Sequence, residues 1–284
     1  MSSIIPINHI KIAVFGVNTY GKNCIKHILG KANSELVGFY EPDEELAYSI
    51  MQLFDLKRYT DADELLEAAD AVIISLPVEK RYETAALSLK KGKHILVESP
   101  VSFKISEIEH LISLANEAQV VHVTSIGGVL SLTESLAKGE NELENEKNIF
   151  IECKRYIDDS KENIFEVLVE DLHLLLQITN SGIRKIFRNS VGHSISVYLE
   201  FENEMSAHYL ISGNIDRNIE KIFLYTSSDK VITIKKDSKT IMVEKDIETL
   251  LSSISENQEH YPFFEKDFVS IFAANKIAGL QAGL

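Results

Sequence analysis

The sequence predicts an α/β protein, with a doubly wound parallel sheet in its N-terminal half and an α/β domain with a largely antiparallel, open sheet in its C-terminal half. Two observations lead to this fold class. Up to about residue 124, short apolar runs alternate with helical patterns, as in repeated βαβ units. After residue 147, apolar and polar side chains alternate along several strand candidates, which is typical of antiparallel sheets. We therefore expect one domain over residues 1–124 and a second over 125–284.

The first half contains five strand candidates separated by helical segments. Each strand candidate is a short apolar run, as expected for strands that are buried on both faces of a parallel sheet. The strand candidates are Lys11–Phe15, Leu36–Tyr40, Ala71–Ser75, His94–Val97 and Val120–Thr124. The helical segments, with apolar residues three and four positions apart, are Gly21–Leu29, Glu44–Phe54, Glu79–Lys90 and Ser106–Ala118. This alternation is the pattern of a Rossmann dinucleotide-binding domain.

A charged segment, Lys138–Lys147, separates the halves and lacks the apolar spacing of a core element. Beyond it we expect a strand, a long helix and further antiparallel strands. These elements are expected at Asn148–Cys153, about Glu162–Thr179, Ser194–Phe201 and Met205–Ile211. Alternation of apolar and polar residues buries one face of a sheet and leaves the other for solvent or a partner subunit.

Composition and charge exclude several classes of function. With 43 acidic and 29 basic residues, the formal net charge is −14, which disfavours binding to nucleic acid. No stretch approaches the ~20 apolar residues that span a bilayer, and residues 1–8 lack the features of a secretory signal. Cys24 and Cys153 are too few for a disulfide framework or a four-ligand zinc site. We therefore expect a cytoplasmic protein that binds neither nucleic acid nor membranes.

A glycine loop follows the first strand candidate, with the sequence Gly16-Val17-Asn18-Thr19-Tyr20-Gly21. In a dinucleotide-binding fold, such a loop turns tightly into a helix whose N-terminus holds a pyrophosphate. Asn18 replaces the middle glycine, and its side chain stands where a phosphate would approach. Glu41, after the second strand, can accept hydrogen bonds from both ribose hydroxyls and would repel a 2′-phosphate, which favours NAD over NADP. The alternative is an ordinary tight turn beside an exposed glutamate.

The fourth strand candidate leads into a turn, in the sequence Gly92-Lys93-His94-Ile95-Leu96-Val97-Glu98-Ser99-Pro100. A second turn, Ser75-Leu76-Pro77, follows the third strand candidate. Through these segments the chain resembles the Gfo/Idh/MocA family of glucose-fructose oxidoreductase and inositol dehydrogenase over nearly its whole length. The resemblance implies an N-terminal Rossmann domain and a C-terminal domain that forms dimers or tetramers through its open sheet. We accordingly add Ser75, Leu76, Pro77 and Glu98 to the cofactor-binding residues expected at the glycine loop and at Glu41.

The chain departs from the family at the residue that follows Glu98. The family has a Glu-Lys-Pro turn, whose lysine helps to bind the substrate hydroxyl and to shuttle its proton, and here that position is Ser99. A serine has neither the charge nor the proton chemistry of an ammonium group, so the family's mechanism cannot run unchanged. Arg81 likewise stands where the family usually has a histidine.

Polar residues form a stripe on the long helix of the second half. Glu166, Glu170, His173 and Gln177 recur at spacings of four, three and four, and therefore share one face of a largely apolar helix. The resemblance aligns Glu166, Glu170 and His173 with the family's catalytic Asp-x-x-x-His and the acid that follows it. One alternative is a solvated helix edge. Another is a metal site, since carboxylate and imidazole groups on one helical face can share an ion.

The leading hypothesis is an NAD-dependent oxidoreductase that transfers a hydride between nicotinamide and a sugar-like or other small hydroxylated substrate, such as a polyol. Ser99, Glu166, Glu170 and His173 would bind the substrate hydroxyls and manage the proton. The competing hypothesis is a non-catalytic dinucleotide-binding or scaffold protein, and a third is that Asn18 abolishes cofactor binding as well. In each case we expect a homodimer or homotetramer built on the open C-terminal sheet.

Overall fold

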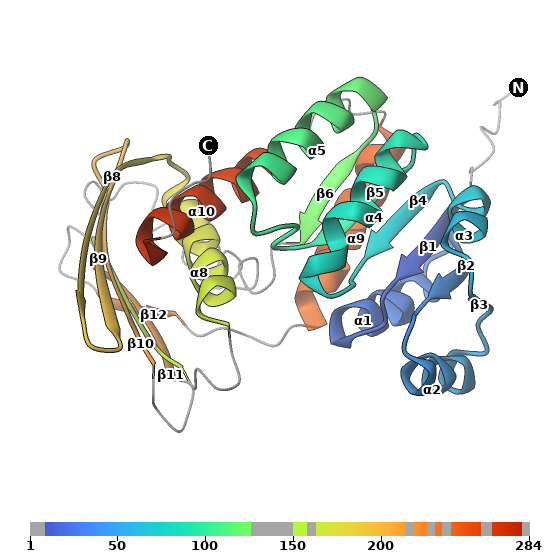
Figure 1. Cartoon of the computed structure of the whole chain (residues 1–284), viewed down its shortest axis with the longest axis horizontal. Helices are drawn as coiled ribbons and strands as arrows, with labels where there is room; N and C mark the ends of the chain where they lie inside the picture. Colours follow the sequence, from blue (N-terminus) through green and yellow to red (C-terminus); the bar gives the residue numbers. More distant parts are fainter. Residues whose placement is uncertain are drawn as a thin grey trace, which may run out of the picture. The chain divides into compact units, whose positions relative to one another are not determined.

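The computed structural model describes residues 9–125, 150–157, 163–213, 219–225, 231–234, 240–256 and 263–279 (Figure 1). The chain forms two compact units. The first comprises Met1–Ser125 and Lys239–Glu265, and the second comprises Ile126–Ser238 and Lys266–Leu284. The charged segment Lys138–Lys147 lies outside the described residues. Within the described ranges, none of the helices has the length and apolar character needed to cross a membrane.

The first unit contains a six-stranded sheet in the order β3-β2-β1-β4-β5-β6, in which neighbouring strands are parallel. Its strands are β1 (Ile10–Phe15), β2 (Ser34–Tyr40), β3 (Arg58–Tyr59), β4 (Ala71–Ile74), β5 (His94–Glu98) and β6 (His122–Ser125). The strand order reverses between β1 and β4, and parallel sheets of this kind bind ligands beyond the carboxyl ends of the strands at such a point. The prediction of a doubly wound parallel sheet is confirmed.

Helices cover both faces of this sheet. They are α1 (Thr19–Ile28), α2 (Glu44–Phe54), α3 (Ala62–Ala68), α4 (Val78–Lys90), α5 (Ile105–Ala118) and α9 (Thr240–Ser255). Ile12 and Val14 of β1 belong to a core formed with α1, α2 and α9, while Ala13 and Phe15 are buried on the opposite face. The sequence predicts most of these elements to within three residues. It misses the short elements β3 and α3, whose few residues provide no full period of an apolar pattern, and it does not single out α9.

The helix α9 returns to the first unit after the chain has formed the second unit's sheet. Four of its apolar residues pack in the same core as α1 and β6, and they are Val243, Ile247, Leu250 and Leu251. The sequence places residues 125–284 in one domain, whereas the structure groups α9 with the N-terminal unit. An apolar helical period shows that one face is buried, but it does not show which sheet buries that face.

The second unit contains a six-stranded mixed sheet in the order β12-β11-β7-β10-β9-β8. Its strands are β7 (Phe150–Tyr156), β8 (Ile183–Val191), β9 (Ser194–Phe201), β10 (Ser206–Ser212), β11 (Ile219–Tyr225) and β12 (Val231–Ile234). Among the described strands of this second sheet, only the β7–β10 pair is parallel, and the other neighbours are antiparallel. The prediction of a largely antiparallel second sheet is therefore confirmed.

Two helices of the second unit, α8 (Ile164–Thr179) and α10 (Phe263–Ala278), accompany this sheet. On β9, Val197, Leu199 and Phe201 are buried, whereas Tyr198 between them is exposed, as the alternation predicts. The buried face is the one that meets α8, because the hydroxyl of Tyr209 on β10 donates to a carboxylate of that helix. On the opposite face, the rings of Phe187 and Tyr198 lie 6.1 Å apart and both are exposed.

Candidate cofactor and active site

Two glycines shape the turn from β1 into α1. Gly16 has φ +85°, a left-handed conformation that favours glycine. A Cβ atom at Gly16 would lie 2.4 Å from the carbonyl oxygen of Ser75, and one at Gly21 would lie 2.2 Å from the carbonyl oxygen of Gly16. A side chain at either position would therefore push α1 away from the carboxyl ends of β1 and β4. Between the glycines, Val17 is buried and Thr19 is exposed.

Asn18 caps the N-terminus of α1 with its own side chain. Its Oδ1 accepts hydrogen bonds from the Tyr20 N–H at 2.8 Å and from the Gly21 N–H at 3.1 Å. The first-turn N–H groups of a helix have no partners within the helix, and they are the groups that bind phosphate in dinucleotide-binding proteins. In this chain, the side-chain oxygen of Asn18 accepts hydrogen bonds from two of these first-turn N–H groups.

Glu41 joins the end of β2 to the glycine loop. It is buried, with 7% of its surface exposed, so it is not the exposed glutamate of the alternative interpretation. One carboxylate oxygen accepts from the Val17 N–H at 3.0 Å and the other from the Asp43 N–H at 3.0 Å. A carboxylate offers about four acceptor positions, so each oxygen retains the capacity for a further hydrogen bond.

Arg58 of β3 lies beside Glu41, but its charge is compensated by another residue. Its Nη2 donates to the Glu41 carbonyl oxygen at 2.8 Å. The same guanidinium binds both carboxylate oxygens of Glu44, at 2.5 and 2.9 Å. This bidentate hydrogen bonding lowers the pKa of Glu44 and raises that of Arg58. The cation at this strand end is therefore already paired with an anion.

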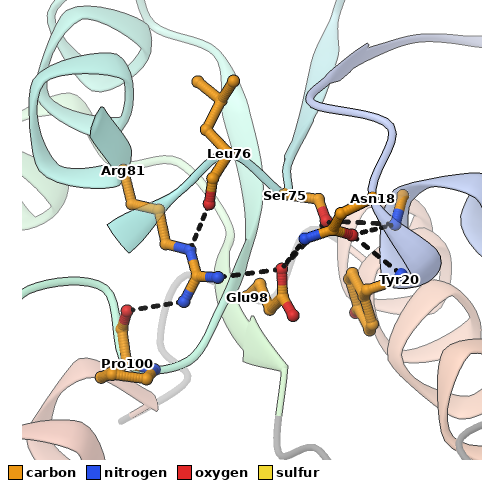
Figure 2. A network of polar contacts seen from close by, with 8 residues as sticks. Asn18, Tyr20, Ser75, Leu76, Arg81, Glu98 and Pro100 are labelled. Carbon is orange, nitrogen blue, oxygen red and sulfur yellow. Dashed lines mark hydrogen bonds and ion pairs between the residues drawn. The ribbon is translucent and has the colours of Figure 1, made fainter. Parts of the chain in front are cut away.

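The carboxylate of Glu98, at the end of β5, connects the turns that follow β1 and β4 (Figure 2). Its Oε2 lies 3.0 Å from Asn18 Nδ2, 2.9 Å from Ser75 Oγ and 3.0 Å from Arg81 Nη2. The Ser75 Oγ atom also lies 2.5 Å from Asn18 Oδ1. Because a hydroxyl has one proton, Asn18 Oδ1 and Glu98 Oε2 share that of Ser75. Ser75 Oγ in turn accepts from the Gly21 N–H at 3.1 Å.

Arg81, on α4, holds together the two turns that follow β4 and β5. Only 8% of its surface is exposed. Its Nε donates to the Leu76 carbonyl oxygen at 2.7 Å, and its Nη1 donates to the Pro100 carbonyl oxygen at 3.0 Å. With the ion pair to Glu98, all three guanidinium nitrogens are bonded. The sequence identifies Arg81 only as a departure from the family, because the partners of a buried arginine cannot be read from spacing.

Ser99 directly follows Glu98 and is half-buried. Leu76 is buried in the neighbouring turn, and Pro77 precedes the first residue of α4. The structure therefore brings together the residues that the sequence assigns to the glycine loop, to Glu41 and to the turns after β4 and β5.

The predicted polar stripe on α8 lies in the second unit. Glu166 and Glu170 are half-buried, and His173 is buried with 3% of its surface exposed. The His173 Nδ1 lies 3.0 Å from the hydroxyl oxygen of Ser270 on α10. The solvated-edge interpretation is therefore wrong for His173, because a neighbouring helix covers it. The side chain of Gln177 lies outside the described residues.

The same helix carries a buried acid that the sequence analysis does not single out. Asp171 has 1% of its surface exposed, and its Oδ2 accepts from the Tyr209 hydroxyl at 2.8 Å. Arg155 Nε on β7 lies 3.7 Å from the same oxygen. An acid among apolar helix residues is the signal that could have identified it, since such acids are rarely buried without a partner.

Among the described residues, one group of histidine and acidic side chains brings three ligand atoms within 4.8 Å of one another, and it lies on α1 and α9 rather than on α8. The group consists of His27, Glu244 and Glu248. Both glutamates are more than half exposed. Lys31 Nζ already lies 2.8 Å from Glu248 Oε1, so an ammonium group compensates part of the charge of this surface cluster.

Comparison with known proteins agrees with this geometry. Residues 10–125 match the Gfo/Idh/MocA model, described as an oxidoreductase family with an NAD-binding Rossmann fold. The chain is 30% identical over 97 residues to glucose-6-phosphate 3-dehydrogenase of Bacillus subtilis, covering 34% of this chain and 28% of that enzyme. It is 23% identical over 177 residues to UDP-N-acetylglucosamine 3-dehydrogenase of Acidithiobacillus ferrooxidans, covering 61% of this chain and 55% of that enzyme. These matches thus span about a quarter and about half of the length of the two relatives.

Solved structures resemble the whole chain in fold. The UDP-N-acetylglucosamine 3-dehydrogenase from Acidithiobacillus ferrooxidans has a TM-score of 0.78 at 17% identity, covering 96% of this chain and 97% of that chain. The scyllo-inositol dehydrogenase from Lactobacillus casei, with bound NAD(H) and scyllo-inositol, has a TM-score of 0.79 at 14% identity, covering 96% of each chain. At these identities, the likeness concerns the fold.

The buried guanidinium of Arg81 leads to a prediction about stability. Replacing Arg81 by Met leaves the Glu98 carboxylate without its cation and two turn carbonyls without a donor, so we expect the free energy of unfolding to fall by about 2 kcal/mol. Urea unfolding of the full chain measures this loss. The matched control is Lys80→Met on the same helix, whose side chain is 67% exposed, and which should change the free energy of unfolding by less than about 0.5 kcal/mol. Equal effects of the two substitutions would contradict the assigned role of Arg81.

Proposed function

We propose that this chain, which belongs to the Gfo/Idh/MocA oxidoreductase family, is an NAD-dependent enzyme that transfers a hydride between nicotinamide and a carbon of a sugar-like or other small hydroxylated substrate. One observation carries the proposal. The glycine loop, the buried Glu41 and the turns after β4 and β5 converge at the carboxyl ends of the strands, where the strand order reverses. The names of the two sugar dehydrogenases among the relatives support the substrate class.

The residues of the glycine loop fit a dinucleotide, provided that the Asn18 side chain moves. The two glycines leave no room for a Cβ atom, because backbone atoms of Ser75 and Gly16 lie there, and this close packing keeps the N-terminus of α1 at the carboxyl ends of β1 and β4. The Tyr20 and Gly21 N–H groups would then exchange the amide oxygen of Asn18 for a phosphate oxygen. When bound, the nicotinamide would supply the hydride chemistry, and the protein would supply orientation and charge.

Local charge favours NAD over NADP in this proposal. Glu41 places a carboxylate where the adenosine ribose would lie, and a carboxylate there repels a 2′-phosphate. Arg58, the cation beside it, is held by both oxygens of Glu44. A 2′-phosphate would have to compete with Glu44 for that guanidinium, at the cost of repulsion by Glu41.

We assign substrate binding to Ser99 and to the half-buried acids of α8. Ser99 can donate or accept one hydrogen bond at a substrate hydroxyl, and Glu166 and Glu170 can accept from others. His173 is covered by α10 and bonded to Ser270, which supports a role in positioning α8 rather than the direct acid–base role expected from the sequence. In this proposal, Glu166 or Glu170 manages the substrate proton.

A second candidate function is non-catalytic binding of the dinucleotide, and Ser99 is the observation that favours it. The ammonium group of the family's lysine has no replacement at this turn, because the guanidinium of Arg81 is already bonded at all three nitrogens. In this second candidate, the protein would retain the fold and bind the dinucleotide but would not convert a substrate.

The remaining properties are proposed on simpler grounds. The open face of the second sheet, with exposed Phe187 and Tyr198, supports a homodimer or homotetramer built on that face. Two buried free cysteines are consistent with a reducing compartment, and we propose the cytoplasm. The net charge of −14 argues against nucleic acid as a partner.

Titration calorimetry of the cofactor-free protein with NADH and NADPH tests the cofactor proposal. We expect NADH to bind at least tenfold more tightly, a difference of about 1.4 kcal/mol, because Glu41 repels the 2′-phosphate. Glu41→Gln should reduce this preference by raising the affinity for NADPH. Glu35→Gln, which removes an exposed carboxylate from the same strand, is the control and should leave the ratio unchanged. Equal affinities of the wild-type protein for the two cofactors would contradict the role of Glu41.

Replacing Asn18 by Gly should raise the affinity for NADH by about tenfold, because the phosphate no longer displaces a capping side chain from the first-turn N–H groups. The same substitution should lower the free energy of unfolding by about 1 kcal/mol, because glycine is a tolerated capping residue but the hydrogen bonds of the Asn18 amide with Glu98 and Ser75 are lost. Calorimetry and urea unfolding of the same preparations measure both quantities. Weaker binding of NADH by the variant would instead show that the Asn18 side chain contributes to the cofactor site.

Replacing Ser99 by Lys distinguishes the catalytic from the non-catalytic candidate. Activity is measured as NADH formation on a panel of sugars and polyols. Turnover by the wild-type protein supports the enzyme, and we expect Ser99→Ala to reduce it because a hydrogen bond to the substrate is lost. Turnover that appears only in Ser99→Lys would support the non-catalytic candidate, because the wild-type site would then need only an ammonium group at position 99 to become active.

A further inference from the structure

A buried hydrogen bond joins the first turn of α1 to α9. The Tyr20 hydroxyl donates to Asp246 Oδ2 at 2.7 Å. Tyr20 has 9% of its surface exposed and Asp246 has 2%. Tyr20 is also the residue whose backbone N–H donates to the cap of α1, as Figure 2 shows. One residue therefore belongs both to the candidate phosphate-binding turn and to the contact with a helix that lies 226 positions further along the chain.

The chemistry of this pair makes the hydrogen bond strong. Burial and the neighbouring Asp246 carboxylate raise the pKa of Tyr20 well above its usual value, so the phenol keeps its proton and acts as the donor. The same two causes raise the pKa of Cys24, which keeps that thiol neutral. A hydroxyl that donates to a carboxylate away from water forms a charge-assisted bond, which is stronger than one between neutral groups.

The position of Asp246 does not depend on Tyr20. Val243, Ile247, Leu250 and Leu251 surround it in sequence on α9 and are buried in the core of the first unit. Apolar packing thus fixes the helix, and the helix presents the carboxylate at a defined point. The residue that the bond can hold in place is therefore Tyr20, in the first turn of α1.

We propose that Asp246 is a positioning residue for cofactor binding, which holds the first turn of α1 through the Tyr20 hydroxyl and so aims its N–H groups at the dinucleotide. This inference rests on the proposed NAD binding. It also implies that residues 10–125, although they contain the whole family match, lack one part of the binding site. That part comes from α9, which the chain adds after it has formed the second unit's sheet.

The chain offers a matched control for the general docking of α9 on α1. Lys31 Nζ lies 2.8 Å from Glu248 Oε1, and this pair joins α9 to the residues that follow the C-terminal end of α1. Glu248 lies on α9, as Asp246 does, but its contact with Lys31 is at the opposite end of α1 from the glycine loop. A variant of Glu248 therefore weakens a contact of α9 without touching the first turn.

The test measures NADH affinity by calorimetry on full-length Tyr20→Phe, Asp246→Ala, Asp246→Asn and Glu248→Gln. We expect Tyr20→Phe and Asp246→Ala each to weaken NADH binding about tenfold. The double variant, which combines Tyr20→Phe with Asp246→Ala, should lose no more affinity than either single variant, because the two residues act through one bond. Asp246→Asn, whose amide oxygen still accepts from the phenol, should stay within about threefold of the wild type. Glu248→Gln should bind NADH as the wild type does. Unfolding of each variant in urea separates lost affinity from lost structure.

A second readout does not depend on the cofactor. Hydrogen exchange of the backbone amides of residues 18–22 should become faster in Asp246→Ala and stay unchanged in Glu248→Gln, because only the first releases the turn. Unchanged exchange together with wild-type NADH affinity in Tyr20→Phe and Asp246→Ala would overturn the positioning role and leave the proposed function intact. Failure of the wild-type protein to bind NADH would overturn the proposed function, and the exchange rates would then decide alone whether Asp246 holds the turn.

Discussion

The carboxylate of Glu98 is the point at which the turns after β1, β4 and β5 are held together. Backbone turns at the carboxyl ends of parallel strands are separate in sequence, and they need side chains to fix their distances from one another. Glu98 does this with one oxygen, which meets the amide of Asn18, the hydroxyl of Ser75 and the guanidinium of Arg81. A negative charge at this place is tolerable because a buried cation and two polar groups surround it.

This arrangement has a consequence for ligand binding. The polar groups that a dinucleotide would use are already engaged within the protein, since Asn18 caps α1 and Glu41 accepts from two backbone N–H groups. At the first turn of α1, binding would exchange the Asn18 oxygen for a phosphate oxygen, whereas the Glu41 oxygens could each accept one further hydrogen bond.

The helix α9 shows that a segment from late in the chain completes the first unit. Its apolar residues complete the core of the first unit, and Asp246 reaches the glycine loop from it. An isolated N-terminal segment would expose that core and leave the Tyr20 phenol without its acceptor. The order of the chain, with the second sheet inserted before α9, makes the first unit's stability depend on residues that follow the second sheet.

The sequence by itself determined the class of each sheet, most helices of the first unit and the resemblance to the family, because these follow from local period, turn residues and short motifs such as Gly16 to Gly21 and Glu98 to Pro100. Tertiary structure alone decided that α9 joins the first unit, that Arg81 binds Glu98 and that α10 covers His173. The physical reason is that a helical period reports that a face is buried without naming what buries it. Likewise, the partner of a buried charge is set by contacts between residues distant in sequence, which no spacing encodes.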